Sequence, residues 1–199
     1  MNQQGKTKRR PGVMLLILIL VFAIPLSIAW VMLKNNDMPG KTTNKGILID
    51  PPFSVALLKI HNEKGDSLTK GRWAMLYLNP GQCKKACQQG LLNMRQIRIA
   101  TGKNMNRVER VILTDKTQDN SRLNRMIQTE YKGTRHLFIT KEDFNNIIQK
   151  HVKTSDALKS GTIYLVDPMG NVIMVYKPNV TPNAIFKDIQ RLLKVSQIG

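Results

Sequence analysis

Residues 70–87, KGRWAMLYLNPGQCKKAC, join an uninterrupted apolar run to a turn and then to a pair of cysteines. The run Trp73–Leu78 is short and contains no polar residue, which indicates a strand buried on both faces. Asn79-Pro80-Gly81 then ends the strand in a turn. Cys83 and Cys87 follow at once, where the chain takes on helical spacing. In an α/β sheet this position, at the carboxyl end of a strand, is where ligands and chemistry are found.

The rest of the chain alternates between helical and strand patterns. Residues 82–101 space Leu91, Met94, Ile97 and Ile99 as a helix would, and Gly102 suits its end. The following pattern predicts a strand at 108–114, a helix from Ser121, a short strand at 137–139, a helix at 140–152 begun by Thr140 and Asp143, a hairpin of strands 163–166 and 172–176, and a helix after Thr181-Pro182. Alternating strands and helices require parallel strand pairs with helices on the sheet faces, and the hairpin adds an antiparallel edge. The predicted fold class is therefore α/β, a thioredoxin-like three-layer domain with a mixed sheet.

A second informative segment lies near the N-terminus. Val13–Leu33 carries no charge, and as a helix rising about 1.5 Å per residue it is long enough for a hydrocarbon core of about 30 Å. Trp30 near one end suits the headgroup boundary. We therefore predict one N-terminal transmembrane helix at residues 13–33. A cleaved signal peptide is the alternative, because Ser27-Ile28-Ala29 offers small residues for cleavage, but the long apolar run favours an uncleaved anchor.

The charges beside the anchor predict its orientation. Residues 1–12 hold the denser basic flank, so this N-terminus is expected in the cytosol and the C-terminal part is expected to be exported. Residues 34–46 are polar with Gly and Pro and are predicted to be a tether. Residues 47–199 are predicted to form the exported thioredoxin-like domain. Without an Arg- and Ser-rich transit peptide, the expected location is a bacterial inner membrane, single-pass, with a periplasmic domain.

The chain is strongly basic, with 31 Lys and Arg against 13 Asp and Glu and a net charge of +18. An exported domain is not expected to bind nucleic acid, which would be the first explanation for a cytosolic protein. Two explanations remain open. One is attraction to anionic headgroups or to an acidic partner. The other is a solvated basic surface that keeps the domain soluble.

The only two cysteines of the chain, Cys83 and Cys87, are spaced C-x3-C. If both lie on a helix they share one face with Cα atoms about 6 Å apart, which permits a disulfide or a shared soft ion such as Cu(I). The helix N-terminus, Lys84 and Lys85 favour the thiolate. We expect a catalytic redox pair or a copper site. A purely structural disulfide stays open, although it would close a very short loop.

The segment LYLNPGQCKKAC, residues 76–87, resembles the signature of the Sco family of cytochrome c oxidase assembly proteins. Residues 111–115, VILTD, are similar to the next strand of that family, and residues 163–170, IYLVDPMG, to its late hairpin. The resemblance covers most of residues 70–195 and the anchor. It implies a membrane-anchored thioredoxin fold that handles copper for the CuA centre. It also implies partners at the inner membrane, either a cytochrome c oxidase subunit or another exported thiol or copper protein.

The sequence departs from the Sco pattern at two positions. The family has proline after its first cysteine, where this chain has Lys84, and a copper-ligand histidine where this chain has Lys159. A cationic lysine is a poor copper ligand. His151, eight residues before Lys159, is the remaining candidate for a third ligand. His61 is expected on a surface turn, and His136 is expected to be structural.

A thioredoxin-type reductase would also carry a cis-proline just before the late strand, and that position falls at about Gly161. A general protein reductase is therefore disfavoured. The expected function is a Sco-like accessory role in oxidase assembly, through thiol redox chemistry or transient copper handling at Cys83 and Cys87. The alternatives are a thiol–disulfide oxidoreductase acting on an exported client, and a non-catalytic interaction module. Whether the chain is an enzyme stays open.

Overall fold

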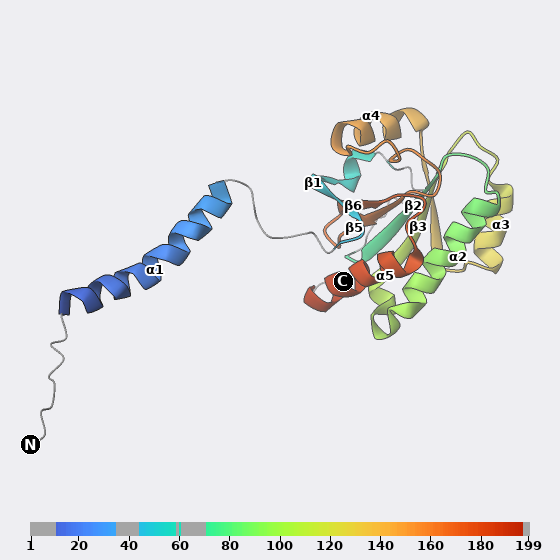
Figure 1. Cartoon of the computed structure of the whole chain (residues 1–199). Helices are drawn as coiled ribbons and strands as arrows, with labels where there is room; N and C mark the ends of the chain where they lie inside the picture. The colour runs from blue at the N-terminus through green and yellow to red at the C-terminus, as the bar shows by residue number, and fades with distance from the viewer. Residues whose placement is uncertain (1–10, 35–43, 59, 61–70, 197–199) are drawn as a thin grey trace, which may run out of the picture. The chain divides into compact units, whose positions relative to one another are not determined.

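The apolar N-terminal segment forms a single helix, α1 (Pro11–Lys34), in the computed structural model, which describes residues 11–34, 44–58, 60 and 71–196 (Figure 1). The helix is long and apolar enough to cross a membrane, and none of its apolar window is buried. Pro25 lies inside it, and the Lys34 ammonium lies 5.4 Å from the centroid of the Trp30 ring. Its length and composition match those of a membrane anchor.

The remaining chain, Asn44–Gly199, is a separate unit built on one six-stranded sheet in the order β1-β6-β5-β2-β3-β4. The strands are β1 (Ile47–Ser54), β2 (Trp73–Asn79), β3 (Val108–Asp115), β4 (Thr134–Ile139), β5 (Ile163–Val166) and β6 (Asn171–Tyr176). β2, β3 and β4 run parallel, whereas β5, β6 and β1 are each antiparallel to the strand they join. The predicted mixed sheet is confirmed.

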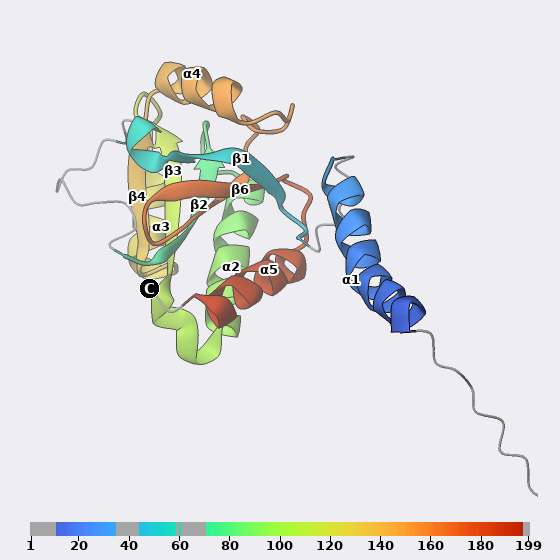
Figure 2. The same ribbon diagram turned by 90° about the vertical axis from the view of Figure 1, so that its left-hand side faces the viewer.

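Helices cover both faces of this sheet, as the two views in Figures 1 and 2 show. α2 (Lys85–Ala100), α5 (Pro182–Val195) and α3 (Ser121–Thr129) pack on one face, and α4 (Lys141–His151) packs on the other. Two 3-10 turns, η1 (Val55–Leu58) and η2 (Gly102–Arg107), complete the unit. This three-layer arrangement confirms the predicted thioredoxin-like fold class.

Two apolar cores result, one on each side of the sheet. On β2 the side chains alternate, so that Ala74, Leu76 and Leu78 join the core under α4 while Trp73, Met75 and Tyr77 join the core under α2 and α5. All seven residues of β2 are buried. The continuous apolar run that suggested a central strand therefore reflects burial on both faces.

From the sequence, one strand of this unit was missed and one side chain was misplaced. β1 was not predicted, because ILIDPPFS has no strand periodicity, and in the structure only Ile49 and Phe53 of this strand are buried. Pro51 and Pro52 interrupt it, the Asp50–Pro51 peptide is cis, and the strand lies at the sheet edge, where proline is tolerated. Ile99 was placed on the buried face of its helix but is 55% exposed, because it lies two residues after Ile97 and so points away from the stripe formed by Leu91, Met94 and Ile97.

Candidate thiol redox site

The cysteine pair lies where β2 ends. Asn79, 2% exposed, donates from Nδ2 to the Gly81 carbonyl at 2.6 Å and so fixes the turn after the strand. α2 then begins at Lys85, so Cys83 precedes the helix and Cys87 lies in its first turn. The prediction that both cysteines share one helix was wrong, because the extended backbone of Lys84 (φ −88°, ψ −172°) delays the helix start.

Cys83 and Cys87 form a disulfide with their Cα atoms 5.1 Å apart. Their environments differ. Cys87 is 2% exposed and belongs to the core under α2, whereas Cys83 is only partly buried beside that core. Cys83 therefore carries the sulfur that a partner molecule can reach first, and Cys87 is positioned to resolve a bond formed there.

The start of α2 makes the site electropositive. The first helical hydrogen bond runs from the Gln88 N–H to the Lys84 carbonyl, so the N–H groups before Gln88 have no helical acceptor. The first turn contains no acidic residue, no side chain caps the helix, and Lys84 and Lys85 are exposed. After reduction, the helix dipole and these two ammonium groups favour a thiolate at Cys83, the reactive form of the side chain.

The loop before β5 closes the site from the opposite side of the turn. The Ser160 hydroxyl donates to Asn79 Oδ1 at 2.9 Å, and the Gly161 N–H donates to the Leu78 carbonyl at 3.0 Å. Gly161, at the position where reductases carry their cis-proline, has φ +93°, which glycine adopts without strain. The loop is thus held to the cysteine turn by hydrogen bonds made through Asn79 and Leu78.

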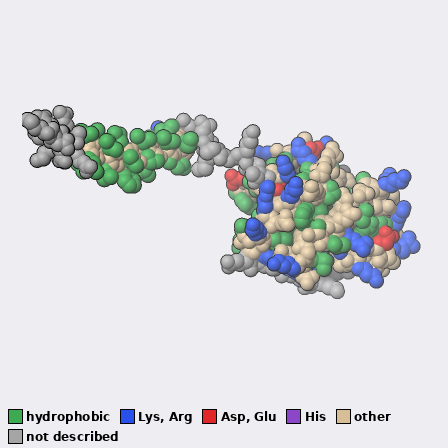
Figure 3. Space-filling view, turned by 60° about the horizontal axis from the view of Figure 1, so that its bottom comes forward, with side chains coloured by type: hydrophobic (Ala, Val, Ile, Leu, Met, Phe, Trp, Pro, Cys, Tyr) green, Lys and Arg blue, Asp and Glu red, His purple; other side chains and the backbone are tan. Residues whose placement is uncertain are grey.

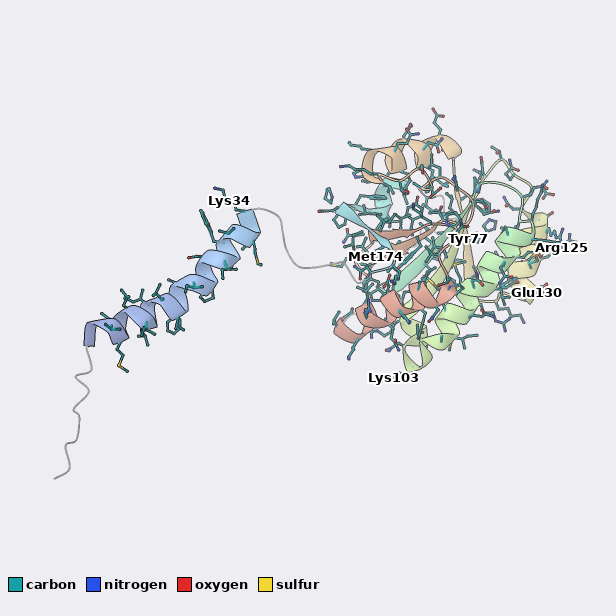
Figure 4. All side chains as sticks on the ribbon, in the orientation of Figure 1. Lys34, Tyr77, Lys103, Arg125, Glu130 and Met174 are labelled. Carbon is teal, nitrogen blue, oxygen red and sulfur yellow. A yellow bond between two sulfur atoms is a disulfide. The ribbon has the colours of Figure 1, made fainter. Side chains whose placement is uncertain are left out.

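Tyr77 forms the floor of the site, between the sheet and α2 (Figure 4). Burial raises the pKa of Tyr77, and a hydrogen bond with Ser160 opposes that rise. Its hydroxyl donates to the Ala86 carbonyl at 3.4 Å, next to Cys87. A cavity of about 280 Å³ opens beside it, lined by Tyr77, Gly90, Ser160, Pro178 and Ile185 among others.

A second cavity, of about 370 Å³, lies at the carboxyl ends of β2 and β3 on the α4 side of the sheet. Leu78, Pro80, Asp115, Phe144 and Leu158 are among its lining residues. It shares the Pro80-Gly81 turn with the disulfide but lies across the sheet from Cys87.

The structure brings Cys83 and Cys87 together but does not bring His151, the candidate third copper ligand, to them. His151 stacks on Phe53 with ring centroids 4.8 Å apart, at the end of α4 and so across the sheet from the cysteines. Lys159 is exposed, and its ammonium lies 2.6 Å from Asp156 Oδ1, so it has no lone pair for a metal. In the described part of the chain, no three His, Cys, Asp or Glu side chains form a group that could hold a metal ion. The two thiols alone do not fit a site of three protein ligands.

His136 has the structural role that the sequence predicted. Its ring nitrogens lie 2.6 Å from Asn124 Oδ1 and 2.7 Å from Thr114 Oγ1, which joins β4 to α3 and β3. Burial lowers the pKa of His136 to about 4, so the ring is neutral at pH 7. His61 lies outside the described residues.

Asn79 and Asp188 are buried polar residues of this domain whose roles the sequence did not predict. Asn79 was treated only as a strand terminator, yet its side chain bridges the turn and the Ser160 loop. Asp188 is 1% exposed and accepts the N–H groups of Lys45 and Gly46 at 2.8 and 3.0 Å. The sequence could have revealed Asp188 as an acidic residue on the apolar face of a helix, between Ile185 and Ile189.

Comparison with known proteins agrees with this fold. The family model described as "Transmembrane-like, thioredoxin-like, C-terminal domain" matches residues 73–196. Among solved structures, copper-bound ScoI of Arabidopsis thaliana has 14% identity and a TM-score of 0.53, and covers 73% of this chain and 98% of its own. Copper-bound yeast Sco1 has 18% identity and a TM-score of 0.51, with coverage of 79% and 96%.

Apo Sco1 of Thermus thermophilus gives 14% identity and a TM-score of 0.53, with coverage of 77% and 99%. No protein of curated function matches this sequence directly. The predicted resemblance to the Sco family is thus confirmed in the fold.

Proposed function

Because this chain belongs to the family of transmembrane-like, thioredoxin-like C-terminal domains, we propose that it is a membrane-anchored thiol–disulfide redox protein whose working pair is Cys83 and Cys87. The observation that carries the proposal is the asymmetry of the pair, with Cys83 partly exposed before an uncapped helix and Cys87 buried within its first turn. A disulfide that served stability alone would gain little from so short a loop.

The exchange follows from these positions. In the reduced protein, the Cys83 thiolate attacks a disulfide of an exported client, one client sulfur leaves as a thiolate, and a mixed disulfide forms. Cys87 then loses its proton and attacks the Cys83 sulfur, which releases the second client thiolate and forms the Cys83–Cys87 disulfide. Two electrons pass to the client, and a dithiol donor must reduce the pair for another cycle. Run in reverse, the same steps oxidise a client dithiol.

Transient handling of copper as cargo is the second candidate, favoured by the copper-bound Sco structures that share this fold. Two thiolates are soft ligands suited to Cu(I). The third ligand is the weak point, since Lys159 is ion-paired to Asp156 and His151 lies across the sheet. We therefore place redox exchange ahead of copper handling for this chain.

The pathway and location are part of the same proposal. The Sco resemblance supports an accessory role in cytochrome c oxidase assembly, with an oxidase subunit or another exported thiol or copper protein as client. The basic residues before α1 support a cytoplasmic N-terminus and a periplasmic domain in a bacterial inner membrane. This orientation places the disulfide in an oxidising compartment.

A redox titration of the full chain in detergent tests the redox proposal. We expect a reduction potential in the range of catalytic pairs, above about −300 mV. In the reduced protein, a limiting amount of alkylating reagent is expected to modify Cys83 ahead of Cys87. The Cys87→Ser variant is expected to trap mixed disulfides, and Cys83→Ser, as the matched control, is not.

A potential below about −300 mV together with equal alkylation of both cysteines would leave only a structural bridge. Loading the reduced chain with Cu(I) tests the second candidate, and retention of one copper per chain after gel filtration would favour it over redox exchange. CuA content in a strain lacking the protein tests the pathway, independently of either chemistry.

A further inference from the structure

The charges of the domain are distributed unevenly between the two sides of the sheet. On the side of α2 and η2, residues 80–108 contain six Lys or Arg and no Asp or Glu. α5 adds three cations and one acid, Asp188, which is buried. Around α4 on the opposite side, residues 140–160 contain four Lys and three Asp or Glu, a near balance. The positive excess therefore lies on one side.

Part of this excess forms a stripe along α5. Lys187, Arg191 and Lys194 are exposed and spaced i, i+4 and i+7, so they share one face of the helix, while Ile185, Ile189 and Leu193 face the core. We call Lys103, Lys187, Arg191 and Lys194 the basic face. Figure 3 looks onto the underside of the domain as drawn in Figure 1, where Lys and Arg side chains are spread with few Asp or Glu among them.

η2 is held beside the end of α5, which brings Lys103 into this face. Arg107 of η2 donates to the carbonyls of Leu193 and Ser196 at 3.1 and 2.7 Å. Lys103 projects from the same underside in Figure 4. Two exposed apolar side chains lie at these helix ends, Ile99 at 55% and Val195 at 79% exposure. Cations with exposed apolar residues are the composition of membrane-surface segments.

Structural roles account for some cations but not for the lysines of this face. Arg98 donates from Nε to the Val108 carbonyl at 2.8 Å, and Arg107 caps the end of α5 as just described, so both satisfy backbone acceptors. Among the described residues, the side chains of Lys103, Lys187 and Lys194 form no ion pair. Like charges left together on one surface repel one another, which an anionic partner would relieve.

The tether joins the domain on α5 itself. The backbone N–H groups of Lys45 and Gly46 donate to Asp188 Oδ2 at 2.8 and 3.0 Å. The chain from Lys34 to Asn44 reaches at most about 35 Å when fully extended. A bilayer crossed by α1 is therefore always within reach of the domain, at the millimolar effective concentration typical of a short linker. An acidic protein would have to be recruited from solution, so the observations favour the membrane.

We infer that the basic face binds the anionic phospholipid headgroups of the membrane in which α1 is anchored. The ammonium groups of Lys103, Lys187 and Lys194 contact headgroup phosphates, while Arg191, which is also paired with Asp188 at 3.9 Å, adds positive charge to the same face, and Ile99 and Val195 enter the interfacial layer. Cys83, which is partly exposed, precedes the other end of α2 and stays accessible to partners. The inference rests on the membrane anchor and is independent of the redox chemistry.

Lysine labelling of the full chain in nanodiscs tests this inference. Acetylation rates, read by mass spectrometry, are compared between discs of phosphatidylcholine and discs that also contain phosphatidylglycerol. We expect Lys103, Lys187 and Lys194 to react several-fold more slowly in the anionic discs, and high salt to remove the difference. Lys150 and Lys153, exposed near α4, are the internal control and are expected to react equally in both.

A variant experiment separates lipid binding from other causes of protection. Deuterium exchange of residues 182–196 is measured in both discs for the wild type and for the triple variant Lys103→Glu, Lys187→Glu, Lys194→Glu. The matched control reverses Lys116, Lys150 and Lys153. Each cation near an anionic surface raises the affinity for anionic lipid about fivefold. Loss of three lysines is therefore expected to reduce the preference for anionic lipid about 100-fold, while the control variant keeps it.

Two outcomes would overturn the inference. One is equal acetylation of Lys103, Lys187 and Lys194 in the two kinds of disc, and the other is a slowing of deuterium exchange at residues 182–196 in anionic discs that persists in the triple variant. Protection that requires an added acidic protein, and not anionic lipid, would overturn it in favour of a protein partner. Normal redox behaviour of the triple variant would show that the redox function of Cys83 and Cys87 does not depend on lipid binding by the basic face.

Discussion

Replacing Asp188 with alanine tests the contact that holds the start of the domain in place. The carboxylate is 1% exposed, and Oδ2 accepts from the N–H groups of Lys45 and Gly46 at 2.8 and 3.0 Å and from the Tyr176 hydroxyl at 3.3 Å. A carboxylate on the core side of a helix is unfavourable unless hydrogen bonds compensate for its lost hydration. These three donors, together with the Arg191 guanidinium 3.9 Å from Oδ1, provide that compensation, and the hydrogen bonds tie the chain before β1 to α5 and β6.

The expected loss of unfolding free energy for Asp188→Ala is about 3 kcal/mol. The buried Gly46 N–H would lose its acceptor, which costs about 1–3 kcal/mol, while the half-exposed Lys45 N–H would recover water and lose about 1 kcal/mol. The Tyr176 hydroxyl keeps the Met174 sulfur at 3.5 Å as a weak acceptor. Relief of the burial penalty of the carboxylate offsets part of the sum.

Urea unfolding of residues 44–199 measures this loss as a lower midpoint at an unchanged slope. Hydrogen exchange adds a local readout, since the Gly46 amide is expected to exchange faster in the variant than in the wild type. Asp188→Asn keeps one acceptor oxygen and is expected to lose less. Gln190→Ala, exposed on the same helix, is the matched control. A loss for Asp188→Ala no larger than that of the control would refute the reasoning.

Three further changes probe other contacts. Burial lowers the pKa of His136 to about 4, below the ~6.5 of an unfolded chain, so stability present above pH 6.5 is lost as the pH falls toward 4. The free energies of unfolding, from urea titrations at pH 7 and pH 5, are expected to differ by about 2 kcal/mol, and His136→Gln should abolish that difference. Gly90→Ala would place a Cβ 2.6 Å from the Tyr77 hydroxyl oxygen and is expected to lower stability by about 1–3 kcal/mol, whereas a gain from helix propensity alone would contradict this. Arg110 is buried, and its Nε and Nη1 lack hydrogen-bond partners among the described residues. Arg110→Met is therefore expected to keep or raise the urea midpoint. A clearly lower midpoint would show that the hydrogen bond from Arg110 to the Lys132 carbonyl outweighs the burial cost.

The central elements of the fold were predictable because local pattern and tertiary environment agree in them. β2 is apolar throughout and is buried throughout. Thr140 and Asp143 form the predicted cap of α4, with the Asp143 N–H donating to the Thr140 hydroxyl oxygen at 3.2 Å. Pro182 opens α5 as predicted, although the Thr181 side chain makes no capping hydrogen bond.

The elements that the sequence did not predict are those created by contacts distant along the chain. β1 exists because it pairs with β6, where Ile47 lies opposite Val175, and its two prolines hide that pairing from any periodic pattern. Asp188 works on residues more than 140 positions earlier, so a local pattern cannot show its partners. The late start of α2 depends on the backbone of Lys84, which a helical spacing of apolar residues does not constrain.

The candidate site shows the same division. The sequence alone identifies Cys83 and Cys87 as the candidate pair, because the chain has no other cysteine. The support beneath them, in which Ser160 reaches Asn79 and Asn79 reaches Gly81, joins segments some 80 residues apart. Such a network is invisible until the sheet brings the loop and the turn together.

That network permits a last prediction, which separates redox exchange from copper handling at one residue. Lys159 directly precedes Ser160, whose hydroxyl donates to Asn79 at the base of the cysteine turn. The Lys159 side chain therefore extends from a loop that is hydrogen-bonded to the site. Lys159→His would exchange an ammonium for a soft-metal ligand, at the small expense of an exposed ion pair with Asp156. Lys177→His is the matched control, because Lys177 also pairs with Asp156, at 3.6 Å, but lies after β6. We expect the reduced Lys159→His chain to bind Cu(I) at least about tenfold more tightly than the wild type and the control, by competition with a chelator. Equal affinities in all three chains would mean that Lys159 is not what keeps this site from holding copper, and the ranking of redox exchange above copper handling would lose that support.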